Sequence, residues 1–210
     1  MAKLTPEGRF AFVTIITPKA MPGQANAEPK YSVRIVFDPK TDVSNVVESI
    51  VEAAQEKWGE KAKEMLKSGA LRNPLRRQAE KSHIQGHGTE GYYIDLRNNE
   101  APGVVDSKAN PILDKTQVKA GMLGRASYRC YAYDKAGNKG VGIGLGNLQV
   151  LRDDGTRWDG RTEATDDFEA MAGDDGFEAQ EGMPVTANAA GAVQGATKPV
   201  AATDPEELFS

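Results

Sequence analysis

The chain has 210 residues, of which 39% are hydrophobic and 27% charged, and its formal net charge is −4. This length permits one large domain, or one medium domain with a tail. The most apolar stretch near the start, residues 10–16, is far shorter than the roughly 20 apolar residues of a membrane-spanning helix, and we expect neither a membrane span nor a secretory signal. The single cysteine, Cys130, rules out an intrachain disulfide and favours a reducing compartment.

The two parts of the chain carry opposite charge. Residues 1–161 hold 25 basic and 19 acidic residues, a net charge of +6, whereas residues 162–210 hold one basic and 11 acidic residues, a net charge of −10. The second part has few large apolar side chains to bury, so its composition predicts a tail that is disordered in isolation. We therefore expect one domain over 1–161 and an acidic tail over 162–210. The tail closes with an acidic and aromatic tip suited to docking on a partner, with a purely solubilising role as the alternative: Asp204, Glu206, Glu207, Leu208 and Phe209.

Five segments of the domain have the composition and alternation of β-strands. They cover residues 9–17, 31–37, 91–97, 125–133 and 139–152. In the last of these, Val141 and Leu145 share one face while Leu148 has the opposite parity. One extra residue in a strand reverses every later side chain, so we expect a bulge near Gly146 and Asn147.

One long helix is expected between the second and third of these strands. Asp42 or Ser44 can cap it, and Gly69 is a natural stop signal. Trp58 lies on the apolar stripe of this helix, which favours packing in the core over a binding platform. Five strands with antiparallel pairing and only one long helix predict a mainly β protein built on a small, curved barrel. The apolar stripe recurs at three- and four-residue spacing: Val47, Ile50, Val51, Ala54, Trp58, Ala62 and Met65.

No pattern in the sequence supports catalysis or a bound cofactor. The alternating glycines at positions 140, 142, 144 and 146 lie within a strand, which argues against a dinucleotide fingerprint, and they leave one face bare for the close approach of another backbone. His83 and His87 lack further ligands at metal-binding spacing, and Cys130 has no nearby cysteine. We therefore expect no enzyme, no metal and no cofactor.

Cations and aromatic rings alternate on the strand faces opposite the apolar residues. An exposed sheet of this kind suits single-stranded nucleic acid, because cations contact the phosphates and rings stack on the bases. A second basic group follows the helix. The candidate nucleic-acid-binding residues are Arg34, Arg72, Arg76, Arg77, Tyr93, Arg97, Arg125, Arg129, Tyr131 and Tyr133.

Residues 91–155 resemble a family of tailed-phage single-stranded DNA-binding proteins. The motifs that carry the resemblance are YDK at 133–135, GNKG at 137–140 and LGNLQVLRD at 145–153, together with an opening strand that ends near Pro18 and an acidic tail. The resemblance implies a five-stranded oligonucleotide-binding (OB) barrel that coats single strands in the host cytoplasm during phage replication, recombination and repair. It also implies that the tail tip contacts phage or host replication proteins and competes with DNA for the basic surface.

Two features depart from the pattern of that family. Ser210 follows the aromatic residue of the tip, and the predicted helix follows the second strand, whereas OB barrels usually carry it between the third and the fourth. Either a strand lies near residues 18–30 or the helix is an elaboration of the family.

Three other functions remain as alternatives, and the formation of a homo-oligomer is left open. The protein could pair strands or bind duplex DNA or RNA, because cations and stacking rings do not distinguish DNA from RNA or a single strand from a duplex. It could be a virion scaffold that uses the barrel for self-assembly, or an enzyme with an unrecognised site.

Overall fold

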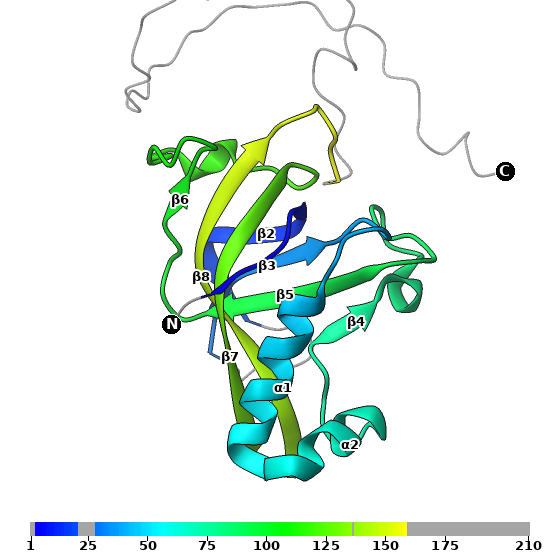
Figure 1. Cartoon of the computed structure of the whole chain (residues 1–210). Helices are drawn as coiled ribbons and strands as arrows, with labels where there is room; N and C mark the ends of the chain where they lie inside the picture. The colour runs from blue at the N-terminus through cyan, green and yellow to red at the C-terminus, as the bar shows by residue number, and fades with distance from the viewer. Residues whose placement is uncertain (1–2, 21–27, 136, 159–210) are drawn as a thin grey trace, which may run out of the picture. The chain divides into compact units, whose positions relative to one another are not determined.

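The computed structural model describes residues 3–20, 28–135 and 137–158 (Figure 1). These residues belong to the first of two units of the chain, Met1–Asp167. The tail predicted over 162–210, with the five residues of its tip, lies outside the described residues.

Five long strands form a barrel: β2 (Gly8–Lys19), β3 (Lys30–Val36), β5 (Tyr92–Asn98), β7 (Leu123–Lys135) and β8 (Asn138–Arg152). They are paired in the order β7-β2-β3-β5-β8, and the long β7–β8 ladder closes the circuit. The β5–β8 pair is parallel and the others are antiparallel. The predicted mainly β, OB-like barrel is thereby confirmed. Short strands extend it, namely β1 (Lys3–Leu4) on β7, β4 (Leu75–Arg77) on β5 and β6 (Val104–Val105) on β8.

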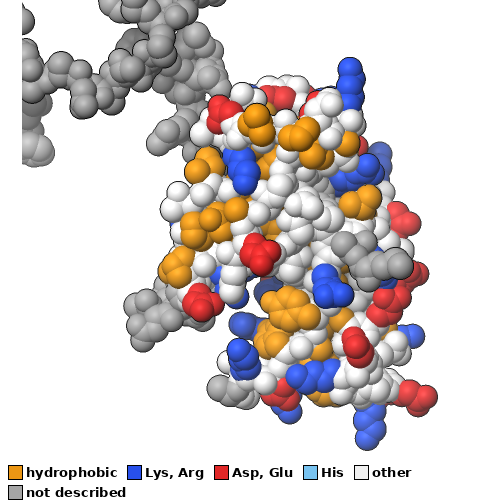
Figure 2. Space-filling view, turned by 90° about the vertical axis from the view of Figure 1, so that its left-hand side faces the viewer, with side chains coloured by type: hydrophobic (Ala, Val, Ile, Leu, Met, Phe, Trp, Pro, Cys, Tyr) orange, Lys and Arg blue, Asp and Glu red, His pale blue; other side chains and the backbone are white. Residues whose placement is uncertain are grey.

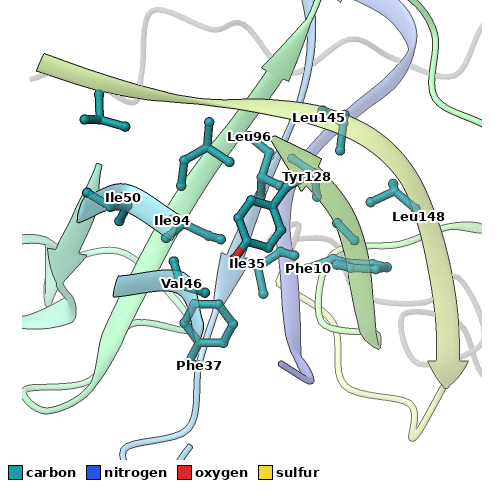
Figure 3. Packing of buried hydrophobic residues seen from close by; sticks show 14 of the residues in the cluster. Phe10, Ile35, Phe37, Val46, Ile50, Ile94, Leu96, Tyr128, Leu145 and Leu148 are labelled. Carbon is teal, nitrogen blue, oxygen red and sulfur yellow. The ribbon is translucent and has the colours of Figure 1, made fainter. Parts of the chain in front are cut away.

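The inner faces of the strands supply the core. Phe10, Ile35, Ile94 and Leu145 are each at most 2% exposed, and Figure 3 shows them converging from four strands. Burial of such a side chain contributes about 1.5–3 kcal/mol. Tyr128 is also buried among them, and its hydroxyl lies 2.9 Å from the Ser49 hydroxyl, so its one polar atom is satisfied inside the core.

The bulge expected in the last strand is present. Tyr128 pairs with Leu145 and Ala126 pairs with Leu148, so β8 carries one extra residue between these two pairs. Leu145 and Leu148 therefore both face the core, at 2% and 1% exposure, despite their opposite parity in the sequence.

The predicted helix is interrupted. It consists of α1 (Ser44–Trp58), a single 3₁₀ turn (Gly59–Lys61) and α2 (Ala62–Lys67). Gly59 adopts φ +66°, a left-handed conformation that ends α1 and turns the chain into α2. The side chain of Asp42 accepts a hydrogen bond from the Ser44 N–H ahead of the helix, and Trp58 packs against the core.

The position of the helix agrees with the sequence. It follows β3, the second barrel strand, and no strand lies between β2 and β3 in the residues that the structure describes there. The predicted apolar stripe needs one correction, because Val47 is 42% exposed while Val46 and Ser49 are buried. The helix is rotated so that part of its apolar stripe faces away from the barrel.

The alternating glycines of β8 allow close approach, as the sequence predicts. Gly140 pairs with Arg72 in an isolated parallel bridge, and a Cβ on Gly140 would lie 2.7 Å from the Arg72 carbonyl oxygen. Gly142 lies under the ring of Tyr131, where a Cβ would lie 2.5 Å from Cζ. The contact of Gly140 with Arg72 attaches the segment after α2 to the barrel, whereas the contact of Gly142 with Tyr131 lies within the β7–β8 pair.

Candidate nucleic-acid interface

A groove of about 710 Å³ crosses the outer face of β2, β3 and β5. Four cations line it, and no acidic residue stands among its lining within the described part of the chain. Its apolar surface includes Phe12 and Ile16, which are 53% and 58% exposed. We call this the basic groove; its lining is Phe12, Val13, Thr14, Ile16, Lys19, Ala20, Lys30, Ser32, Arg97, Thr116, Val118, Lys119, Ala120 and Trp158.

A bulge in β2 places Phe12 in this groove. The β2–β3 register shifts between Ala11 and Thr14, and Phe12 has φ +49°, a conformation that L-residues other than Gly rarely adopt. The bulge lets Phe10 and Ile15 both face the core despite their opposite parity, at 0% and 1% exposure. As a consequence, the Phe12 ring projects outward, where a planar base could stack on it.

The guanidinium of Arg34 packs against the rings of Phe12 and Tyr93. Its guanidinium carbon lies 4.9 Å from the centre of the Phe12 ring and 4.3 Å from that of Tyr93, within the range of a cation–π contact. Two nitrogens of Arg34 donate to the Asp95 carboxylate at 2.7 and 3.0 Å, and the side chain is only 12% exposed. The structure therefore places Arg34 in a paired, mostly buried position and gives it a supporting role in the groove.

His87 packs against Arg34 and Tyr93 and forms one cluster with them and Phe12. Its Nε2 lies 3.3 Å from Nη1 of Arg34, and its ring meets the Tyr93 ring edge-on at 5.3 Å between centres. A guanidinium can only donate, so Nε2 must accept and His87 must be neutral in this arrangement. Burial is the main cause that lowers the pKa of His87 below its ordinary 6.5, with the Arg34 charge acting in the same direction.

The expectation that the Tyr93 side chain is exposed is wrong. The outer face of β5 carries Tyr93, but the ring is only 3% exposed because Arg34, His87, Ala11 and Val36 surround it. A period of two predicts which face a side chain lies on, but it does not predict whether neighbours then cover that face.

A second part of the interface lies on β8 and β7. Arg97 of β5 pairs with Gly144 of β8, and Gly144 pairs with Arg129 of β7, so a bare glycine lies between two cations. Next to it, the Tyr131 ring is 49% exposed and lies against Gly142. We call Gly140, Gly142 and Gly144 on the outer face of β8 the glycine strip. Because Arg97 pairs with Gly144 and also lines the basic groove, the groove and the glycine strip form one continuous outer surface. Tyr133 follows on the same face, opposite Gly140, and is partly buried.

The remaining predicted cations lie elsewhere. Arg125 donates from Nε to Gln149 at 2.8 Å and lines a separate apolar cavity near β6, on the side of the molecule where Figure 2 shows hydrophobic side chains at the surface. Arg76 pairs with Glu80, and Arg77 is exposed on β4. Arg72 contributes its backbone to the Gly140 contact. These four do not line the basic groove.

Sequence reasoning missed several residues of the groove. The backbone N–H of Trp158 donates to the Ala120 carbonyl at 3.1 Å. The centre of the Trp158 ring lies 5.9 Å from the Arg9 guanidinium carbon. The signal for Phe12 was available, since Phe10 and Ile15 can both be core residues of one strand only with a bulge between them. The lysines lie at strand ends or in loops, where no periodicity marks them. The residues missed are Phe12, Lys19, Lys30, Lys119 and Trp158.

Comparison with known proteins identifies the family. The family model described as "Enterobacter phage Enc34, ssDNA-binding protein" matches residues 2–178. This chain belongs to that family. The expected kinship with phage single-stranded DNA-binding proteins is therefore confirmed. A curated relative, "Putative protein p50" of Acyrthosiphon pisum secondary endosymbiont phage 1, is 24% identical over 168 residues, which cover 78% of this chain and 90% of the relative.

Solved structures of phage single-stranded DNA-binding proteins share the fold. The single-stranded DNA-binding protein from bacteriophage Enc34 in complex with ssDNA has a TM-score of 0.58 at 15% identity, covering 72% of this chain and 86% of that one. The single-stranded DNA-binding protein gp2.5 of bacteriophage T7 has a TM-score of 0.52 at 18% identity, covering 77% and 97%.

Two further observations concern the described residues of this Enc34-family chain. None of its helices there is long and apolar enough to cross a membrane. Within the same residues, no group of three or more His, Cys, Asp and Glu side chains is placed to hold a metal ion.

Proposed function

We propose that this protein binds single-stranded DNA without sequence preference, along the basic groove and the glycine strip. The observation that carries the proposal is the lining of the groove, which combines the cations Lys19, Lys30, Arg97 and Lys119 with the exposed Phe12 ring and includes no acidic residue of the described part of the chain. Cations that follow a backbone, combined with rings that accept any base, give affinity without base readout. The family of the chain and the ssDNA complex of the Enc34 protein support this proposal.

A role in phage DNA metabolism is part of this proposal. The protein would coat single strands in the host cytoplasm during phage replication, recombination and repair, without catalysing a reaction. The acidic tail would contact replication proteins and compete with DNA, because its net charge of −10 imitates a polyanion and the domain carries +6.

The proposal is tested by titrating a labelled dT oligonucleotide at two salt concentrations, with anisotropy as the readout. Arg129 is exposed and has no ion pair among the described residues, so Arg129→Ala should remove one phosphate contact and lower the slope of log affinity against log salt by about 0.7. The loss should be equal for dT and mixed-sequence oligonucleotides.

Lys108→Ala is the matched control, because it removes one exposed cation from a turn outside the groove. Arg125→Ala shows whether the interface extends along β7 to the β6 cavity. Affinity that is indifferent to salt, or that Arg129→Ala and Lys108→Ala reduce equally, would contradict the proposed interface.

A further inference from the structure

The rotation of α1 leaves apolar surface that the barrel does not cover. The apolar stripe of the helix continues to Val47 and Val51, one turn apart, while the core contacts are made by Val46, Ile50 and their neighbours. Val47 is 42% exposed, which is unusual for a valine on the apolar side of a helix. The helix therefore presents a second, narrower apolar strip toward α2.

A notch of about 240 Å³ lies where this strip meets α2. Figure 1 shows α2 beside the end of α1, close to the start of β4. We call this the α1–α2 notch. Its apolar walls are formed by Val47, Ile50, Val51, Leu66 and Leu75.

Two lysines flank the notch. Lys63 and Lys67 are exposed and stand four residues apart on α2, so their side chains project from the same face of the helix. Neither has an ion pair among the described residues, and no acidic residue of that part of the chain lines the notch. A small apolar pocket beside two unpaired cations fits a short peptide in which acidic residues precede apolar ones.

The tail of this chain contains such a peptide. Its acids fall into two groups, eight within 163–181 and three within 204–207, separated by a stretch without acids. The first group complements the larger basic groove, whose charged lining residues are all cations. The second stands next to Leu208 and Phe209, and burial of these two side chains against the apolar walls of the notch would be favourable. We propose that residues 204–209 dock in the α1–α2 notch of the same chain, with Glu206 and Glu207 facing Lys63 and Lys67.

The length of the tail permits this docking. Roughly 45 residues separate Trp158 from the tip, and a flexible segment of that length has a root-mean-square span of about 35–40 Å. A domain of roughly 160 residues has a radius of gyration of about 15 Å, so the tip can reach any face. Tethering also supplies a millimolar effective concentration, so a weak pocket is sufficient. The notch shares no lining residue with the basic groove, so the tip can dock whether or not DNA occupies that groove.

The test uses the full chain with a nitroxide label on Ser210→Cys and amide NMR signals as the readout. Burial raises the pKa of the Cys130 thiol to about 11, so at neutral pH the label reacts with the introduced cysteine. We expect the signals of Val47, Lys63 and Leu75 to lose most of their intensity. Broadening centred on Lys19 and Lys119 of the basic groove, or no localised broadening, would overturn the proposal.

Charge exchange makes the test specific. Lys63→Glu with Lys67→Glu should abolish the broadening at the notch, and adding Glu206→Lys with Glu207→Lys should restore it. Lys108→Glu, an exposed control elsewhere, should leave it unchanged. If isotope-labelled chains without nitroxide are broadened in a mixture with spin-labelled ones, the tip docks on a second copy and the same-chain proposal fails.

DNA affinity of the same variants is measured separately. Lys63 and Lys67 do not line the basic groove, so the loss of notch docking and the loss of DNA binding are independent results.

Discussion

Individual side chains of the groove are fixed by contacts that lie outside it. The Phe12 ring projects because a bulge is needed to bury both Phe10 and Ile15, and it rests on a guanidinium held by Asp95. The backbone conformation at Phe12 costs about 1 kcal/mol or more for an L-residue. The domain therefore maintains a strained position that presents an exposed aromatic ring, which is typical of a functional site.

Replacing this ring separates binding from folding. Phe12→Gly should weaken single-stranded DNA binding by about 1–3 kcal/mol, roughly 5- to 150-fold, because a stacking surface is lost. The free energy of unfolding should change by less than about 1 kcal/mol, since relief of the φ +49° strain offsets the greater flexibility of glycine. Anisotropy and urea unfolding measure the two effects. As a control, Leu113→Gly, which is 92% exposed outside the groove, should not alter the affinity.

His87 makes the stability of this cluster depend on pH. The folded protein lowers its pKa, so the unfolded chain binds the proton more readily below the ordinary value of 6.5. This contribution to stability is complete above pH 6.5 and is lost progressively as the pH falls from there toward the folded pKa. Thermal unfolding should therefore occur at a lower temperature at pH 5.5 than at pH 7.5.

The two histidines of the chain provide the comparison for this pH effect. His87→Gln should reduce the difference in unfolding temperature between the two pH values, whereas His83→Gln, at an exposed position, should change it much less, because the charge of His83 is the smallest of the causes given for the lowered pKa of His87. An equal effect of both substitutions would show that the difference arises elsewhere.

At the level of elements, β8 forms the second part of the interface, next to Arg97 of β5. Its glycines let the backbone at Arg72 and the Tyr131 ring approach, and its bulge returns Leu148 to the core. Without the bulge, the residues beyond Gly146 would turn their apolar side chains to solvent.

The glycines of this strand should differ in their tolerance of alanine. Gly140→Ala should lower the free energy of unfolding by about 1–3 kcal/mol, because its Cβ would lie 2.6–2.9 Å from Arg72 Cβ, O and N. Gly144→Ala should be tolerated, since its nearest neighbour would be 3.5 Å away. Urea unfolding of both variants tests this difference, and equal destabilisation would mean that the contact with Arg72 is not what requires glycine at position 140.

At the level of the whole molecule, the separation of charge links the tail to the groove. The domain and the tail carry +6 and −10, and the tail's acids are concentrated in residues 163–181, directly after the domain. Opposite charges on one chain attract most strongly when few ions screen them.

Removing the tail should therefore tighten DNA binding. A chain that ends at Arg161 loses ten net negative charges, and its affinity for a dT oligonucleotide should exceed that of the full chain, most of all at low salt. Parallel anisotropy titrations of the two chains measure the difference. Equal affinities at low salt would contradict competition by the tail.

The sequence alone determined the five long strands, the approximate extent of the helix, the bulge in β8 and the opposite charges of the two parts, but not the short strands β1, β4 and β6. These features depend on local periodicity, composition and parity, which can be read along the chain. The outward positions of Arg97, Arg129 and Tyr131 were also predicted this way, because alternation places them on outer faces and no neighbour buries them deeply.

Only the tertiary structure decided which outer side chains stay accessible and which segments meet. Arg34 and Tyr93 alternate as predicted, yet neighbouring strands and the loop that carries His87 cover them. The basic groove joins residues from 12–20, 30–32, 97, 116–120 and 158, segments whose proximity depends on barrel closure and on loops without periodicity. The physical reason is that alternation is a property of one strand, whereas exposure depends on every segment packed against it.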